Sequence, residues 1–388
     1  MSSSFRVAMQ QVGVHGRFLH AAFDAALKKL NEFDIRGLAN LAWAVAVSRS
    51  NCAHQKTALL TQLASAAQVA LRHQLRSVSN ELEVRSLIFS LLSLAWALRF
   101  QSSLGRDVEG DLYAGLRHLA RVLESSRCRW PRPDRPLQMA SLPKELNEPI
   151  VILNCRGMVV ALKPPGWEVD TSAKGQSEAL SLSMFLQSQL PPEENNLLYD
   201  FNYGFGFVHR LDVASSGLIL AARTFDGLIC LQWQKALCAI DREYIVVCTG
   251  LGETLRMVTI RAEVAARGLH KYSRTLTQDN GLPAETRLRT VAQLNTASGG
   301  LLGGASLVVI QIYTGRRHQI RAHTRFIGHP TACDAWYTPN AVRLYLEDLL
   351  QPMPLRAWVR TPRWVGELIP PPKDMVGEVY DPGLAAVQ

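Results

Sequence analysis

One short stretch of the chain places a carboxylate and two basic side chains between two apolar segments. Residues 207–224 run from Phe207-Val208 through His209, Arg210 and Asp212 into an apolar run. The small residues at 215–217 predict a turn, and residues 218–222 predict a buried strand. An unpaired buried carboxylate is costly, so Asp212 should have a basic partner or a chemical role. The residues alone leave two interpretations open, a turn aspartate paired with Arg210 and a catalytic carboxylate.

Further polar strings follow in order, and together they resemble one family. Residues 207–218 resemble the HRLDxxTSGL signature of the RluA-type pseudouridine synthases. Four later strings also match that family's pattern, namely its Lys-x-Tyr segment, its PAxT strand entry, its TGRxHQIRxH motif and its GHPxxGDxxY motif; they lie at 242–244, 283–286, 314–323 and 328–337. An earlier string, Lys163-Pro164-Pro165-Gly166, matches its NKPxG loop. The resemblance covers about residues 148–378.

The resemblance implies an RNA pseudouridine synthase. Such an enzyme breaks the N1 glycosidic bond of a uridine and rejoins the sugar to C5. It implies that Asp212 is the essential carboxylate and that Arg321 is its partner. A planar guanidinium can orient a carboxylate through two parallel hydrogen bonds and keep it anionic, as a nucleophile must be. By the same resemblance, Tyr244 stacks on the base and assists proton removal at C5.

The resemblance also implies a substrate-binding set. Arg210 resembles the residue that fills the gap left by a flipped uridine. His209, Arg316 and His318 are expected either to support the site structurally or to face phosphates. The expected partner is RNA, whether rRNA, tRNA or mRNA, with no metal and no organic cofactor. The sequence leaves the RNA, the target uridine and the oligomeric state open.

Four positions depart from the family pattern. Ser215 replaces threonine, Arg242 replaces lysine, and Arg356 stands where a histidine is usual. Cys333 stands where glycine is common, and its Cβ would strain the turn if φ is positive. These changes leave a second function open, a catalytically weak or inactive RNA-binding or RNA-chaperone protein that keeps the fold.

Composition agrees with a polyanionic partner. The chain has 388 residues, a formal net charge of +9 and a sequence pI near 9.3. Seven scattered cysteines without metal-ligand spacing indicate reduced thiols in an intracellular protein. No apolar run is long enough to span a bilayer, so a soluble protein is expected. Residues 1–20 have arginines, serines and no acidic residue, so both a cytoplasmic and an organellar location, in mitochondrion or chloroplast, are open.

The pattern of apolar residues divides the chain into segments. Residues 1–125 predict an all-α region and residues 126–148 a Pro/Arg-rich linker; residues 149–378 predict the catalytic domain and 379–388 a tail. The string Leu-Ala-Trp-Ala occurs around Trp43 and again around Trp96. It resembles the core of octotricopeptide-like and FAST-kinase-like helical repeats, which bind RNA. The alternative is an amphipathic helical layer whose tryptophans belong to its core.

The catalytic part should be an α+β domain built on a mixed sheet. A hairpin is expected over 149–163, turning at Arg156-Gly157. Further strands are expected after the strand at 218–222. Helices are expected on both sides of that strand and after the last strand. The expected strands are 244–248, 256–264, 284–294 and 305–313, and the expected helices are 179–190, 226–240 and 316–327.

Overall fold

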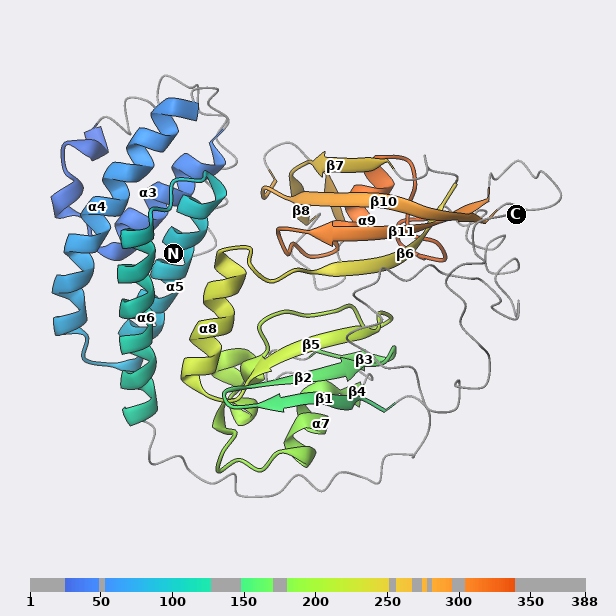
Figure 1. Ribbon diagram of the computed structural model, residues 1–388, viewed down its shortest axis with the longest axis horizontal. Coiled ribbons are helices and arrows are strands. Elements are labelled where there is room, and N and C mark those ends of the chain that lie inside the picture. Colours follow the sequence, from blue (N-terminus) through green and yellow to red (C-terminus); the bar gives the residue numbers. More distant parts are fainter. Residues whose placement is uncertain are drawn as a thin grey trace, which may run out of the picture.

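The protein is an α+β structure in which a layer of helices precedes a sheet-rich part (Figure 1). We describe it from a computed structural model, over residues 25–48, 53–126, 148–169, 180–250, 256–266, 274–277, 281–294 and 304–338. Residues 1–20, nearly all of the predicted linker, Arg356 and the tail lie outside these residues. The α+β class expected from the sequence is confirmed.

The helical layer contains α3 (Ile35–Val47), α4 (Ala53–Ser77), α5 (Glu81–Phe100) and α6 (Arg106–Ser126), after the short η1 (Leu30–Glu32). Two of these helices begin at capping side chains. The carboxylate of Asp34 accepts a hydrogen bond from the Gly37 amide at 2.7 Å, and Asn80 accepts one from the Glu83 amide at 2.9 Å. Each cap satisfies an amide that has no partner inside its helix.

The two Leu-Ala-Trp-Ala strings lie on α3 and α5, the closely packed pair of the layer. The alanines Ala42 and Ala95 are fully buried, whereas Trp43 and Trp96 are only half-buried. Small side chains let the two helix backbones approach closely. The tryptophans therefore lie at the edge of the core rather than inside it. A repeat architecture is not confirmed.

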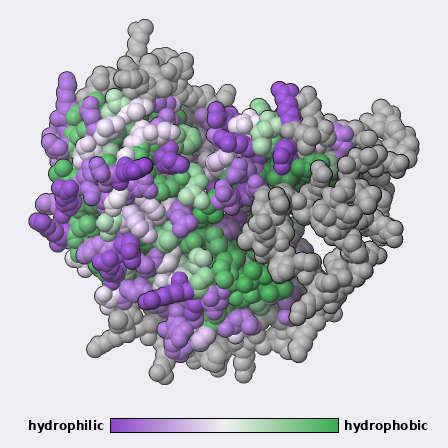
Figure 2. Space-filling view, in the orientation of Figure 1, coloured by the Kyte–Doolittle hydropathy of each residue, from purple (hydrophilic) through white to green (hydrophobic). Residues whose placement is uncertain are grey.

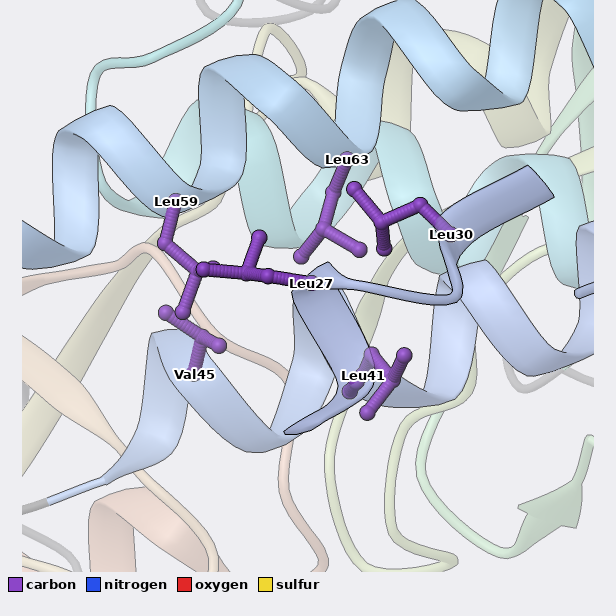
Figure 3. A pocket seen from close by; sticks show the side chains of 7 residues that line it. Leu27, Leu30, Leu41, Val45, Leu59 and Leu63 are labelled. Atoms are coloured by element: carbon purple, nitrogen blue, oxygen red, sulfur yellow. The ribbon is translucent and has the colours of Figure 1, made fainter. Parts of the chain in front are cut away.

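The layer contains an apolar hollow between the segment before η1 and helices α3 and α4 (Figure 3). Leu27, Leu30, Leu41, Val45 and Leu63 point toward it. Its volume is about 10 Å³, at the lower limit for a single water. It is a packing defect among leucines and has no room for a ligand.

Helix α8 (Phe225–Ala236) joins the helical layer to the sheets (Figure 1). Its residues Leu228, Leu231 and Trp233 are buried in the same hydrophobic cluster as the leucines of α5 and α6. Burial of each such side chain stabilises the fold by about 1.5–3 kcal/mol. The rings of Tyr113 and Trp233 lie 5.4 Å apart at this contact. The helical layer and the sheet-rich part therefore share one hydrophobic cluster.

One antiparallel sheet has the order β1-β2-β5, with β1 at Ile150–Cys155, β2 at Met158–Lys163 and β5 at Gly217–Ala222. The predicted hairpin is confirmed, since Cys155 pairs with Met158 and Ile150 with Leu162. Gly157 has φ +89° at the turn, a conformation that L side chains rarely adopt. Figure 2 shows hydrophobic residues gathered over this sheet, where Ile150, Ile152 and Leu218 are exposed.

The second antiparallel sheet has the order β6-β11-β10-β7. Its strands are β6 (Glu243–Thr249), β7 (Met257–Arg261), β10 (Glu285–Leu294) and β11 (Ala305–Ile312). In the described residues, parallel pairing of the predicted mixed sheet is limited to β3 (Trp167–Glu168) and β4 (Leu180–Ser181). Two further short strands, β8 (Val264–Ala266) and β9 (Thr275–Thr277), pair with each other.

Helices α7 (Leu182–Gln189) and α9 (Gln319–Phe326) lie near the two sheets, and η2 (Asn196–Tyr199) and η3 (Phe201–Gly206) precede the central motif. All three predicted helices of this part were too long. The helix expected from 179 begins at Leu182, because residues 180–181 form β4. The helix expected to reach 240 ends at Ala236, because Cys238 has φ +55°. The helix expected from 316 begins at Gln319, because His318 has φ +51°. Among the described residues, no helix is both long enough and apolar enough to cross a membrane.

Candidate active site

Asp212 lies in the loop that leads into β5. The loop is anchored by the buried Leu211 and by an amide-to-carbonyl hydrogen bond of 3.0 Å from Ser215 to Asp212. The Asp212 side chain is 38% exposed, so a substrate can reach it. The turn comes earlier than predicted, at Val213-Ala214 rather than at residues 215–217, because Gly217 already pairs as the first residue of β5. This turn holds the carboxylate at the surface of a packed core.

Lys163 fixes the backbone beside this aspartate. Its ammonium is buried and donates to the carbonyls of Pro164, Trp167 and Val213 at 2.9, 2.9 and 3.2 Å. The amide of Gly166 donates to the same Val213 carbonyl at 2.8 Å. Burial lowers the pKa of Lys163 to about 8, and the negative charge of Asp212 partly opposes this shift. The loop of residues 163–167 thereby clamps the residue that follows Asp212.

Arg321, on α9, contacts two carboxylates. Its Nη1 donates to Asp212 Oδ2 at 3.1 Å, while its Nε and Nη2 donate to Asp334 at 2.6 and 2.7 Å. The two parallel hydrogen bonds expected toward Asp212 are therefore made to Asp334, and that part of the prediction was wrong. Asp334 occupies the edge formed by Nε and Nη2, so Nη1 is the nitrogen that contacts Asp212. We call Asp212, Arg321 and Asp334 the carboxylate network.

Asp334 is the rigid member of this network. Its side chain is only 9% exposed and accepts further hydrogen bonds from the Thr331 hydroxyl at 2.7 Å and the Trp336 amide at 3.0 Å. Burial opposes its charge, but the hydrogen bonds from Arg321, Thr331 and Trp336 outweigh burial and lower its pKa. Burial likewise opposes the charge of Arg321, and Asp334 and Asp212 keep the pKa of that guanidinium raised.

Two aromatic rings contact the Arg321 guanidinium. The ring centroids of Tyr337 and Trp336 lie 4.6 and 5.4 Å from the Arg321 guanidinium carbon. The Tyr337 hydroxyl donates to the Thr275 carbonyl and accepts from the Thr275 amide, at 2.9 and 2.8 Å. Arg321 is thus held by two carboxylates and an aromatic pair, which leaves it little freedom to rotate.

A buried hydrogen-bond chain fixes α9 against β10. The Gln319 amide group donates to the Glu285 carbonyl and the Thr286 hydroxyl at 3.0 and 2.9 Å. His323, fully buried, lies 2.9 Å from the Thr286 hydroxyl and 2.9 Å from the Ala262 carbonyl. Every polar side-chain group in this hydrogen-bond network has a partner. The network therefore fixes the position of α9, and with it the position of Arg321.

Tyr244 lies on β6, where the cores of the two sheets meet. Its side chain packs against the apolar clusters of both sheets. Burial raises the pKa of its phenol, the charge of Arg242 opposes this shift, and the charge of Asp212 adds to it. Tyr244 and Arg321 come from the second sheet and its helix, whereas Asp212 comes from the first. The site therefore forms at the junction of the two sheets.

The two predicted histidines have different surroundings. His209 Nε2 accepts the Leu220 amide at 3.0 Å, and burial, with the charges of Lys235 and Arg242, lowers its pKa to about 4. Its Nδ1 is buried and has no partner within the described residues. A neutral ring bonded to the backbone favours the structural role for His209.

His318 lies closer to the carboxylate network. Its Nδ1 is 3.1 Å from the Tyr337 hydroxyl, whose own proton is donated to Thr275, so Nδ1 is the donor. Burial lowers its pKa, and the charge of Asp212 opposes that shift. The neutral ring then presents the lone pair of Nε2.

The predicted arginines also separate. Arg210 is exposed, and within the described residues it forms no hydrogen bond or ion pair. Arg316 is half-buried, donates to the Pro283 carbonyl at 3.0 Å and lies 5.7 Å from the ring centroid of Trp96 on α5. Arg210 is thus available to a substrate beside Asp212, whereas Arg316 links the second basic motif to the helical layer.

Two residues matter more than the sequence indicated. Asp334 and Lys163 were noted within family strings but were given no role. Their presence in those strings was the signal that could have pointed to a role. An aspartate or a lysine that is buried needs a partner, so each could have been expected to hold another group in place. The strain expected at Cys333 is supported, since its φ is +56°. Within the described residues, no group of three or more His, Cys, Asp or Glu side chains could hold a metal ion.

Comparison with known proteins shows which family this chain is similar to. Residues 157–326 match the family model of RNA pseudouridylate synthase. A relative from Nitrosomonas europaea, ribosomal large subunit pseudouridine synthase D, is 31% identical over 156 residues, covering 39% of this chain and 42% of the relative. RNA pseudouridylate synthase domain-containing protein 1 of Bos taurus is 28% identical over 177 residues, covering 44% of this chain and 55% of the relative.

Solved structures give a weaker likeness. Human RNA Pseudouridylate Synthase Domain Containing 1 has a TM-score of 0.40 and 21% identity, over 52% of this chain and 74% of that chain. The chain spans about two-fifths to one-half of the length of the curated relatives described above. On the family match and the sequence signatures that line the site, residues 157–326 are an RNA pseudouridylate synthase domain of the RluA type.

Proposed function

We propose that this protein isomerises uridine to pseudouridine in RNA, with Asp212 as the catalytic carboxylate. One observation carries the proposal. Asp212 Oδ2 is bonded to Arg321, whereas Oδ1 has no hydrogen-bond partner within the described residues. Arg321 is in turn fixed by Asp334. An anionic, oriented carboxylate with one unoccupied, accessible oxygen is what nucleophilic attack or proton transfer requires.

The proposed reaction is an isomerisation without net oxidation. The bond between N1 and C1′ breaks, C5 bonds to C1′, the proton on C5 leaves, and N1 gains a proton. No oxidant or metal takes part in that balance. Asp212 acts on the nucleotide while the detached uracil turns within the site. The pocket must therefore hold the base and orient it through a half-reaction in which it is not attached to the sugar.

Tyr244 is the proposed base-stacking residue. Its raised pKa keeps the phenol neutral near pH 7, so its ring is suited to stack on uracil and its hydroxyl to donate a hydrogen bond. Arg210 is proposed to occupy the space left when the target uridine leaves a stem, because it is exposed two residues from Asp212. His318 and Arg316 are proposed to face the substrate backbone, with His209 in support.

The substrate class is proposed as RNA, and ribosomal RNA is the first candidate to test. The relatives from Nitrosomonas europaea and Haemophilus ducreyi are named as synthases of the ribosomal large subunit, the latter 30% identical over 135 residues, 34% of this chain and 39% of the relative. An organellar location and an octotricopeptide-like role for the helices remain proposals. Imaging of the tagged chain, with and without residues 1–20, tests the first.

The experiment compares wild type with Asp212→Asn in single-turnover assays on ribosomal RNA. Because the substitution keeps the shape and removes the charge, we expect turnover to fall at least about 10²-fold while RNA binding is unchanged. Asp241→Asn is the control, since Asp241 is an exposed carboxylate just before β6. Turnover of Asp212→Asn within a few-fold of wild type contradicts the assignment.

A second measurement separates the enzyme from an RNA-binding protein without turnover. Pseudouridine is mapped by site in RNA from cells with and without the protein, and in cells carrying Asp212→Asn. We expect one or more sites to lose pseudouridine both in cells without the protein and in cells carrying Asp212→Asn. Unchanged maps, combined with intact RNA binding in vitro, support the RNA-binding alternative.

A further inference from the structure

Helix α5 touches the catalytic part near both of its ends. Near its start, Arg85 donates to the Asn202 carbonyl at 2.8 Å and lies 4.9 Å from the ring centroid of Tyr203. At its end, Arg99 donates through Nε to the Leu237 carbonyl at 3.2 Å. Each arginine thus ties the helix to the catalytic part through one backbone carbonyl. Their surroundings otherwise differ.

The end of α5 lies among basic side chains. Arg242 donates to the Tyr313 carbonyl at 2.8 Å, and the Cys238 thiol contacts the same carbonyl at 3.5 Å, one residue from the acceptor of Arg99. Lys235, on α8, donates to the Val208 carbonyl at 2.6 Å. We call Arg99, Lys235, Arg242 and Arg316 the basic cluster.

Electrostatic effects agree that these charges are close together. Burial raises the pKa of the Cys238 thiol, and the charges of Arg242, Arg99 and Arg316 all oppose that shift. Burial lowers the pKa of Lys235, and Arg242 and Arg316 lower it further. Side chains from α5, from α8 and from the loops before β6 and after β11 therefore repel one another at this place.

In the part of the chain that the structure describes, three members of the basic cluster are not balanced by a carboxylate. Glu285 is the carboxylate that acts on Cys238 there, and it is itself paired with Arg261 at 3.0 Å and Arg287 at 3.3 Å. Within the described residues, Arg99, Lys235 and Arg242 form no ion pair. Like charges gathered without counterions destabilise a fold, and a polyanion relieves that repulsion.

The basic cluster begins beside the candidate active site. Arg242 lies just before β6 and two residues from Tyr244, and its charge acts on the Tyr244 phenol. Arg316 lies two residues before His318, so it too is close in sequence to a residue of the candidate active site. The basic cluster thus extends from the catalytic tyrosine to the helical layer.

The helical layer adds aromatic rings to this surface. Trp96 faces the Arg316 guanidinium at 5.7 Å, and its ring stacks on Phe100 with centroids 4.9 Å apart. Phe100 is 38% exposed. Aromatic rings beside basic side chains are the combination that binds single strands of nucleic acid, through stacking and phosphate contacts together.

We propose that the RNA strand next to the target uridine crosses the basic cluster and reaches the end of α5, where Arg99 contacts a phosphate and Trp96 and Phe100 offer a stacking surface. This inference rests on the proposed function, because it takes RNA as the substrate. It assigns the helical layer a direct part in RNA binding. Removing the whole layer cannot test this, because α8 would then expose Leu228, Leu231 and Trp233.

The test measures RNA affinity of the full chain at several salt concentrations, with a labelled oligouridine strand as probe. We expect Arg99→Gln to weaken binding about 3- to 10-fold and to reduce the slope of log affinity against log salt by about 0.7, as for one lost phosphate contact on a single strand. Arg99→Lys should keep the slope, because it keeps the charge.

Arg85→Gln is the matched control. It lies on the same helix and also loses one hydrogen bond to a backbone carbonyl, together with its contact to the Tyr203 ring, so its thermal stability should fall at least as much as that of Arg99→Gln. We expect its salt slope to equal that of wild type. An unchanged slope for Arg99→Gln, or an equal reduction for Arg85→Gln, overturns the inference. Binding does not require turnover, so an inactive wild type with an Arg99-dependent slope refutes only the proposed function.

Discussion

The carboxylate network and the basic cluster lie side by side and handle charge in opposite ways. In the carboxylate network, one guanidinium is shared by two carboxylates, and the buried Asp334 fixes its orientation. In the basic cluster, Lys235 is destabilised as a cation by burial and by the charges of Arg242 and Arg316. Paired charges give a fixed geometry, and unbalanced charges give attraction for a polyanion. Chemistry needs the first property and substrate binding needs the second.

The largest expected effect comes from breaking the pairing. Asp334→Asn removes the two-point partner of Arg321, which then turns toward Asp212 and occupies its available oxygen. We expect single-turnover rates to fall about 10²-fold on single strands and stems alike. Loss of a buried partner should also lower the free energy of unfolding by about 3 kcal/mol, measured by denaturant titration.

Glu285→Gln is the control for this experiment. Glu285 also pairs with two arginines, at 3.0 and 3.3 Å, but outside the carboxylate network. It should alter stability slightly and leave the rate within a few-fold of wild type. If Asp334→Asn retains the wild-type rate at a temperature where it is folded, Asp334 does not orient Arg321 for chemistry.

A smaller effect is expected at Arg210. Arg210→Ala removes an exposed side chain that forms no hydrogen bond or ion pair within the described residues, so stability should not change. If Arg210 fills the vacated stack, turnover should fall about 10-fold on a stem and less than about 3-fold on a single strand. Arg156→Ala, an exposed arginine in the hairpin turn, controls for lost charge. Equal losses on both substrates would rule out this role.

The smallest expected effect concerns the pH dependence of stability that His209 causes beside the basic cluster. The pKa of His209 is about 4 in the folded protein, against 6.5 ordinarily, through burial and the charges of Lys235 and Arg242. The unfolded chain therefore binds more protons between these values, and stability falls as the pH drops from 6.5 toward 4.

His209→Gln keeps an acceptor for the Leu220 amide and cannot be protonated. We expect it to lose less stability than wild type between pH 7 and pH 5, by on the order of 1 kcal/mol, in denaturant titrations at both pH values. The other histidines are present in both proteins, so the difference isolates His209. Parallel pH profiles would show that His209 is not held neutral by its surroundings.

Local patterns in the sequence were sufficient for the elements and for the chemistry-bearing strings. The hairpin at 150–163, the strands at 285–294 and 305–312 and helix α8 follow from periodicity and from glycine at the turn. Periodicity misjudged the helix ends, because Cys238 and His318 adopt positive φ. A single residue's backbone conformation is set by its neighbours in space, and its type gives little sign of it.

Resemblance of the strings, rather than spacing alone, brought Asp212, Tyr244 and Arg321 together in advance. It also paired Arg321 with Asp212, and the two form a hydrogen bond of 3.1 Å, but it did not indicate that Arg321 makes its two parallel hydrogen bonds to Asp334. Arg321 and Asp212 lie 109 positions apart, and Arg99 and Leu237 lie 138 apart. Which carboxylate takes the two-point edge of Arg321, and which helix end meets the basic cluster, depends on how packed elements orient their side chains. Tertiary packing alone decided those contacts. A hydrogen bond requires its donor and acceptor to lie about 3 Å apart, and a local sequence pattern does not specify the distance between residues so far apart in the chain.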